Sequence, residues 1–99
     1  MTISKKQNGK VVELAPEGRL DTITAPELDA EIAKIADEDI EGLVLNFEKL
    51  EYISSAGLRV LLNGMRAMEG KGGMKIINAC ELIQEVFSVT GFDSILDIE

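Results

Sequence analysis

One short apolar run decides the fold: Gly42-Leu43-Val44-Leu45-Asn46-Phe47. It has the length of a strand and almost no polar positions, which is the pattern of a strand covered on both faces. We therefore expect it at the centre of a sheet. Helix patterns precede and follow the run, and helices that alternate with strands connect parallel neighbours. The run thus predicts an α/β fold with a mixed sheet.

The helix pattern before the run extends from Thr24 to about Glu38. Thr24 and Glu27 have the spacing of a capping box, and Pro26 sits in the first turn, where proline is tolerated. Apolar residues recur at i, i+4 and i+7 between charged positions, so one face of this helix is expected to be buried. That face carries Leu28, Ile32 and Ile35.

The helix pattern after the run begins at the serine pair Ser54-Ser55 and ends at Gly70-Lys71-Gly72-Gly73. This glycine cluster follows a helix and lacks the spacing of a phosphate-binding loop, so we interpret it as a helix end and turn. The residues expected to face inward are Leu58, Leu61, Leu62, Met65 and Met68, while Arg59, Asn63 and Arg66 lie on the other face.

The ends of the chain complete the pattern. Asn8-Gly9 predicts a β-hairpin that continues through Val11–Ala15. A strand is expected from Met74 to Asn78 and a short edge strand within Phe92–Ile98. Between these two lies a third helix, which is stopped by a glycine: Glu81 to Thr90, with Leu82, Val86 and Val89 at helical spacing before Gly91.

The predicted architecture is therefore an N-terminal β-hairpin joined to a mixed four- to five-stranded sheet, packed with about three to four helices. Ninety-nine residues are the length of one domain, so we expect a single unit spanning residues 1–99. The one cysteine, Cys80, cannot form an internal disulfide and is interpreted as a small buried residue. A small chain without disulfides fits the reducing cytosol, and no apolar run approaches the ~18 residues of a membrane span, so we expect a cytoplasmic protein. Because the chain is small and acidic, we expect a monomer.

Composition excludes several classes of function. Eighteen acidic residues against ten basic ones give a net charge of −8, the wrong sign for direct binding to nucleic acid or anionic lipid. Histidine is absent, which removes the usual general base, the His-dependent triads and most zinc sites. The carboxylates show no spacing typical of a metal site or an acid/base pair. We therefore expect no catalytic residues, metal or cofactor.

The serine pair is the most informative candidate site. A helix start offers free N–H groups, and ordinary N-capping by a serine explains the pair without any ligand. Gly57, in the first turn, costs helix stability and suggests close access to the backbone. A serine nucleophile would lack a histidine to activate it, whereas a serine phosphorylated by another enzyme needs no base of its own. Arg59 and Arg66, with Asn63 between them, could meet an acidic partner or serve solubility alone.

Several segments in order resemble the STAS family, specifically the stand-alone bacterial anti-sigma-factor antagonists. The strongest is Leu43–Phe47 followed by Tyr52-Ile53-Ser54-Ser55-Ala56-Gly57-Leu58-Arg59-Val60-Leu61. Gly18-Arg19-Leu20-Asp21 and Val86–Phe92 support it, so the resemblance spans nearly the whole chain. It implies a STAS fold.

The resemblance also implies which residues act. The phosphoryl acceptor would be Ser55, two residues before Gly57. The family often has aspartate where this chain has Ser54 and Asn46, which leaves Ser54 as a competing acceptor. The loop aspartate beside the site corresponds to Asp21, whose alternative role is to stabilise a turn. The expected partner-binding residues are Asp21, Ser54, Ser55, Ala56, Gly57, Arg59 and Asn63.

The implied function is partner switching. When unphosphorylated, such a protein binds an anti-sigma-factor serine kinase and frees the sigma factor for transcription. Phosphorylation by that kinase releases it, and a metal-dependent serine phosphatase resets it. Three alternatives stay open: a switch with another output such as secretion or cyclic-dinucleotide signalling, a STAS scaffold subunit of a larger assembly such as a lipid-transport complex, and an enzyme of unknown chemistry.

Overall fold

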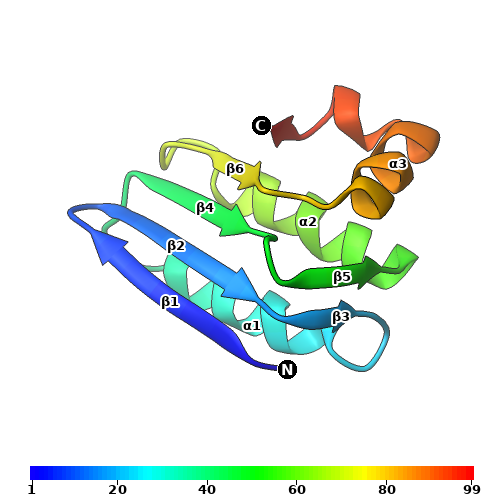
Figure 1. The fold of residues 1–99 in the computed structure, drawn as a ribbon. Coiled ribbons are helices and arrows are strands. Elements are labelled where there is room, and N and C mark those ends of the chain that lie inside the picture. The colour runs from blue at the N-terminus through cyan, green and yellow to red at the C-terminus, as the bar shows by residue number, and fades with distance from the viewer.

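The computed structural model describes all residues from Met1 to Glu99 and has an α/β architecture. Strands and helices alternate after an initial hairpin, as expected (Figure 1). The elements are β1 (Ile3–Asn8), β2 (Val11–Pro16), β3 (Gly18–Leu20), α1 (Ala25–Ala36), β4 (Gly42–Asn46), β5 (Leu50–Ile53), α2 (Ser55–Ala67), β6 (Met74–Ile77), α3 (Glu81–Thr90), the 3₁₀ turn η1 (Phe92–Ser94) and β7 (Asp97–Ile98).

The main sheet has five strands in the order β1-β2-β4-β6-β7, with β4 at its centre as predicted. The β1–β2 pair is antiparallel and the other pairs are parallel, so the sheet is mixed. The hairpin turn lies one residue later than expected: Asn8 pairs with Val11, and Gly9-Lys10 form the loop. Gly9 has a φ of 64°, which a glycine at the first loop position of such a hairpin adopts without strain.

Both long helices, α1 and α2, lie on one face of this sheet (Figure 1). The crossovers from β2 to β4 and from β4 to β6 proceed in the same direction across the sheet, so a common right-handed sense places both helices on the same side. The opposite face is open, and Val44 is only half-buried. The prediction that the strand at residues 42–47 is covered on both faces is therefore wrong.

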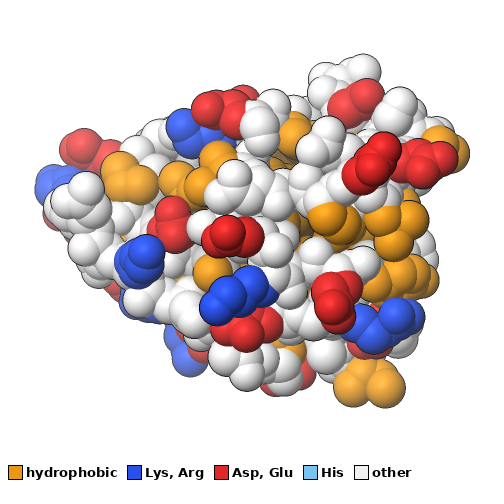
Figure 2. Space-filling view, in the orientation of Figure 1, with side chains coloured by type: hydrophobic (Ala, Val, Ile, Leu, Met, Phe, Trp, Pro, Cys, Tyr) orange, Lys and Arg blue, Asp and Glu red, His pale blue; other side chains and the backbone are white.

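The uncovered face of the sheet carries charged side chains, which are stable in contact with water. The strand register aligns Lys6, Glu13, Val44, Lys75 and Asp97 in one row across the five strands. Neighbouring opposite charges in such a row are favourable and well hydrated. Figure 2 shows this face with acidic and basic side chains interspersed, which is the surface expected of a sheet side that no helix covers.

A second, two-stranded parallel sheet was not predicted. β3 pairs with β5, with Leu20 opposite Ile53. These short strands extend the chain beyond β2 and β4 and lie together at one end of the molecule (Figure 1). Three or four residues carry too little periodicity to be recognised as strands in the sequence.

The predicted inner face of α1 is confirmed, because Leu28, Ile32 and Ile35 are all buried. The predicted capping box is wrong. The side chain of Thr24 makes no capping bond, and Glu27 instead accepts hydrogen bonds from the Met1 ammonium group at 3.0 and 3.2 Å. The chain fold brings this ammonium group to the first turn, where it outcompetes the local interaction. The helix also ends at Ala36, two residues earlier than expected.

The inner stripe of α2 is confirmed in part. Leu58, Leu61 and Met68 are buried, whereas Leu62 and Met65 are half-buried. Residues 70–73 form the expected turn after the helix, with positive φ at three glycines.

None of the helices is both long and apolar enough to cross a membrane.

Helix α3 buries a different face from the one that its apolar spacing suggests. Leu82 is 52% and Val89 81% exposed, while Ile83 and Phe87 are buried. Both sets have helical spacing, and the set that contains the large aromatic ring packs inward. The helix ends at Gly91, which has a left-handed φ of 81°, as predicted.

Candidate functional site

The paired strands β3 and β5 bring two distant segments of the predicted site together. Leu20 and Ile53 are register partners, and the Ser54 N–H donates to the Leu20 carbonyl at 2.9 Å. Asp21 follows Leu20 directly, and Ser55 follows Ser54. Because the strands are parallel, both segments leave the small sheet at the same edge. The loop aspartate and the serine pair therefore lie at one end of the molecule.

The two adjacent serines have different environments. Ser54 is half-buried in extended backbone just before α2, and its Oγ accepts a hydrogen bond from the Gly57 N–H at 3.4 Å. This is the geometry of an N-cap. Ser55 is the first residue of the helix, is exposed, and its hydroxyl makes no hydrogen bond within the protein. Ser54 thus serves the fold, and Ser55 presents a free hydroxyl to solvent.

Gly57 is required by packing. A Cβ atom at this position would lie 2.7 Å from Ile53 Cγ1 and 2.9 Å from Leu20 Cγ, closer than real contacts allow, and 3.0 Å from the Leu20 carbonyl oxygen. The close approach expected at this glycine is therefore to the two short strands beneath the helix. Ala56, next to it, is half-buried against the core.

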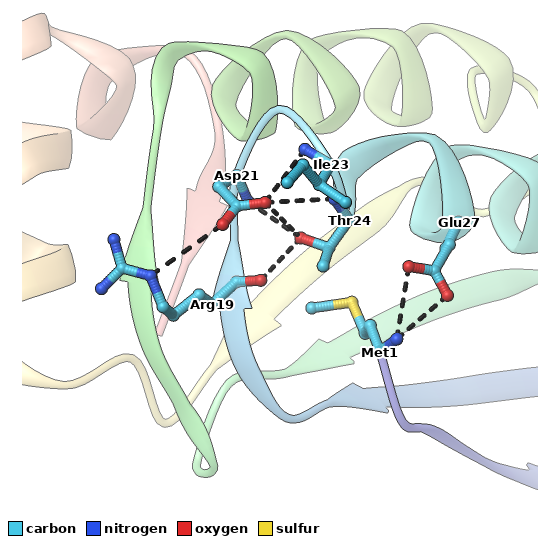
Figure 3. A network of polar contacts seen from close by, with 6 residues as sticks. All are labelled: Met1, Arg19, Asp21, Ile23, Thr24 and Glu27. Carbon is cyan, nitrogen blue, oxygen red and sulfur yellow. Dashed lines mark hydrogen bonds and ion pairs between the residues drawn. The ribbon is translucent and has the colours of Figure 1, made fainter.

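Asp21 organises the loop between β3 and α1 (Figure 3). Its Oδ1 accepts hydrogen bonds from the Ile23 N–H at 3.0 Å and the Thr24 N–H at 3.1 Å. The Thr24 hydroxyl donates to the Arg19 carbonyl at 2.6 Å and accepts from the Asp21 N–H at 2.9 Å. The bond from the Thr24 N–H is the main reason that the pKa of Asp21 lies below its usual value. The turn-stabilising role is thus present, and it leaves the Ile23 side chain 83% exposed.

Arg19 belongs to the same end of the molecule and was not among the predicted site residues. Its guanidinium lies 4.1 Å from the centroid of the Tyr52 ring, a cation–π distance, and its Nε lies 3.9 Å from Asp21 Oδ2. Arg19 and Tyr52 are register partners in the β3–β5 pair, so recognition of these strands would have revealed the contact. Arg19 is therefore already engaged by two neighbours.

The other predicted residues occupy the outer face of α2. Arg59 and Asn63 are both exposed and lie one and two turns beyond Ser55.

Asn46 is the last residue of β4, and its side-chain oxygen accepts hydrogen bonds from Asn78 Nδ2 at 3.2 Å and from the Glu48 N–H at 3.1 Å. Asn46 therefore ties together the ends of β4 and β6.

Neither a metal site nor a deep cavity accompanies the serines. No group of three or more His, Cys, Asp or Glu residues is placed to hold a metal ion. A hollow of about 480 Å³ lies around the beginnings of β4 and β6 and is lined in part by Val11, Met65 and Ile95. The reactive group that this end of the molecule exposes is the Ser55 hydroxyl.

Comparison with known proteins gives a consistent family. The STAS domain model matches residues 2–99. BtrV of Bordetella bronchiseptica, designated an anti-sigma factor antagonist, is 36% identical over 85 residues, which cover 83% of this chain and 72% of BtrV. The anti-sigma-B factor antagonist of Bacillus subtilis is 26% identical over 99 residues, covering 99% of this chain and 90% of that protein.

Solved structures share the fold. An anti-sigma factor antagonist from Mycobacterium paratuberculosis superposes with a TM-score of 0.89 at 21% identity, over 98% of this chain and 83% of that one. The anti-sigma factor antagonist SpoIIAA in its unphosphorylated form gives a TM-score of 0.83, also at 21% identity, over 99% and 88% of the two chains. The match of the family model over nearly every residue, with this agreement in fold, shows that the chain belongs to the STAS domain family.

Proposed function

We propose that this protein is an anti-sigma-factor antagonist that works as a phosphorylatable partner switch, with Ser55 as the phosphoryl acceptor. One observation carries the assignment of the acceptor: of the two adjacent serines, Ser54 is engaged as the helix cap, while the Ser55 hydroxyl is exposed and unbonded. A kinase can reach the Ser55 oxygen without disturbing the cap. The names of the relatives support a role in sigma-factor regulation.

The reaction is performed on the protein by its partner. The Ser55 oxygen attacks the γ-phosphorus of ATP held by an anti-sigma-factor serine kinase, the bond to the bridging oxygen breaks, and ADP leaves. The hydroxyl proton passes to a base of the kinase, because no side chain of this protein hydrogen-bonds the Ser55 hydroxyl. A metal-dependent serine phosphatase reverses the modification by hydrolysis, which returns serine and inorganic phosphate. The protein itself thus acts as a regulatory binding partner and substrate.

Charge at the interface provides the switch. Phosphorylation adds about −1.5 to −2 charges at Ser55. The helix start tolerates this charge, because the dipole term there is favourable by about 0.3–1 kcal/mol. In an interface, juxtaposed like charges cost several kcal/mol, and about 2.8 kcal/mol already weakens binding a hundredfold. The surface that contacts the kinase comprises Asp21, Ser54, Ser55, Ala56, Arg59 and Asn63. Gly57, which the sequence placed with them, is buried against the short strands and supports this surface from beneath.

Phosphoryl transfer tests the acceptor. The protein is incubated with the anti-sigma-factor kinase of its own organism and ATP, and the modified residue is located by site-resolved mass spectrometry. We expect label on Ser55 in the wild type and in Ser54→Ala, and none in Ser55→Ala. Label on Ser54, or on neither serine, would overturn the assignment.

Binding tests the switch. Ser55→Ala is expected to bind the kinase as the unphosphorylated protein does, and Ser55→Asp to bind about a hundredfold more weakly. Equal affinities for the two variants would contradict partner switching. Stable co-purification with a larger assembly, indifferent to phosphorylation, would indicate a scaffold subunit instead. Binding to a kinase that controls no sigma factor would keep the chemistry and change the output.

A further inference from the structure

Helix α2 differs in charge from the rest of this acidic protein. The chain has 18 Asp and Glu residues, yet Ser55–Ala67 contains none and carries two arginines. The first turns of the other helices hold an acid, Glu27 in α1 and Glu81 in α3, whereas the first turn of α2 has none. A negative charge stabilises this position of a helix. Helix α2 therefore lacks the charge that its two counterparts have.

Arg59 is the cation nearest along this helix to the Ser55 hydroxyl. It lies four residues after Ser55, so the two side chains occupy the same face one turn apart, with Cβ atoms about 5–6 Å from each other. The Arg59 side chain is exposed and makes no ion pair or hydrogen bond with any other residue. Arg19, by contrast, is already paired with Asp21 and stacked on Tyr52. Among the two, Arg59 is the guanidinium free to take a new anion.

We propose that Arg59 is the intramolecular partner of phosphoserine at position 55, an i,i+4 ion pair that forms only after modification. This inference rests on the proposed function, because it requires the phosphoryl group on Ser55. The phosphate oxygens accept charge-assisted hydrogen bonds from the guanidinium, whose planar donors suit them. The order along the helix, with the anion N-terminal to the cation, is the favourable one.

The pair gives the switch a second component. In the unphosphorylated protein, Arg59 offers a free positive charge beside Ser55, available to an acidic group of the partner. After phosphorylation the same guanidinium is occupied by the phosphate. The modification thus lowers the net charge of this helix face by about 1.5 to 2 units and engages its guanidinium in a new ion pair. A partner selected for the unphosphorylated surface then finds the Arg59 donors already occupied.

The test uses protein with phosphoserine introduced at position 55 during translation, so no kinase is needed. The second pKa of the phosphoserine is measured by ³¹P NMR titration in the wild type, Arg59→Gln and Arg66→Gln. Arg66 is the matched control, because it is also exposed and on α2 but lies three turns from Ser55. Asp21 and Arg19 also lie at this end of the molecule and are unchanged in all three proteins.

Pairing with Arg59 stabilises the dianion, so Arg59→Gln is expected to raise the phosphoserine pKa by about 0.3 unit, while Arg66→Gln leaves it unchanged. In the wild type, the Nε–H resonance of Arg59 is expected to shift on phosphorylation and that of Arg66 to stay. Equal shifts for both variants, or no shift for Arg59→Gln, would overturn the pair. Failure of the kinase to label Ser55 would instead refute the proposed function and leave this measurement intact.

Discussion

Helices α1 and α2 lie side by side on the same face of the sheet and have similar inner faces but opposite outer faces (Figure 1). Each buries a stripe of aliphatic residues in one common core. The outer face of α1 carries three acids and one lysine, and that of α2 carries two arginines and no acid. The inner faces therefore account for the fold, and the outer faces differ because only α2 is suited to accept the phosphate that we propose for Ser55.

The starts of the two helices differ in the same sense. At α1, the polar groups are engaged within the protein: Asp21 and Thr24 bond the loop, and Glu27 binds the Met1 ammonium group. At α2, Ser54 caps the helix and Ser55 remains unbonded. An engaged start contributes stability, whereas an open start offers a site for modification.

The largest expected loss of stability comes from disturbing the close packing between α2 and the short strands beneath it. Gly57→Ala places a Cβ 2.7 Å from Ile53 Cγ1 and 3.0 Å from a backbone oxygen of Leu20, which cannot move freely. We expect a loss of about 1–3 kcal/mol in the free energy of unfolding, measured by urea denaturation.

Gly64→Ala is the matched control for Gly57→Ala. Its Cβ meets Met74 Sδ at 3.0 Å and two Ile32 side-chain carbons at 3.3 Å, so every close neighbour is a side-chain atom and none is backbone. The gain in helix propensity, about 1 kcal/mol, offsets this crowding, so a net change within about 1 kcal/mol is expected. A larger loss at Gly64 than at Gly57 would show that the α1–α2 contact is tighter than that between α2 and the short strands.

The serine pair gives the next largest effect. Ser54→Ala removes the capping oxygen from the Gly57 N–H and is expected to cost about 0.5–1 kcal/mol in the free energy of unfolding. Ser55→Ala removes a hydroxyl with no partner in the protein, and a change within about 0.5 kcal/mol is expected. Equal losses in thermal or urea denaturation would mean that both hydroxyls support the helix, which contradicts the open start.

Periodicity predicted the parts of this molecule that long elements build, and missed those that depend on tertiary contacts. The stripe of Leu28, Ile32 and Ile35 was visible because several turns repeat it. The pairing of β3 with β5, and with it the contact of Arg19 with Tyr52, was not, because three- and four-residue strands have no measurable period. The role of Glu27 was also hidden, since its partner is 26 residues away.

The site shows the same division. The serine pair at a helix start could be found in the sequence, and so could the turn role of Asp21. The sequence alone could not tell which serine caps the helix, because either hydroxyl could have reached a free N–H. The backbone geometry of the structure was needed to decide. The inner face of α3 was ambiguous because two apolar sets with helical spacing compete, and only the packing of Phe87 decides between them.

The difference in charge between α1 and α2 can be tested by adding an acid to the first turn of α2 or removing the acid from the first turn of α1. Ser55→Asp supplies the charge that α2 lacks and is expected to raise the free energy of unfolding by about 0.3–1 kcal/mol, even though it weakens partner binding. Glu27→Gln removes the negative charge of the first turn of α1 and the ion pair with the Met1 ammonium group, with a loss of similar size. Both effects should shrink in 1 M salt, where screening acts within about 3 Å. Destabilisation by Ser55→Asp would refute the charge argument for α2.

The smallest expected effect is a difference in how the stability contributed by the two helix starts depends on pH. The pKa of Asp21 is lowered from 3.8, mainly by the hydrogen bond from the Thr24 N–H, so its charged form favours the folded state. This stability is present above about pH 3.8 and is lost as the pH falls through the lower pKa of the folded protein. Asn at position 21 keeps an acceptor oxygen for the same N–H groups and removes only the charge.

Urea denaturation at pH 7 and pH 3 measures this difference. The wild type is expected to exceed Asp21→Asn in stability at pH 7, and the gap to narrow at pH 3. The cost of Ser54→Ala should be the same at both pH values, because a hydroxyl does not titrate there. A gap for Asp21→Asn that stays constant would show that the start of α1 depends on hydrogen-bond geometry alone. The two starts would then differ only in whether their polar groups are engaged, and the carboxylate would owe its place to partner binding.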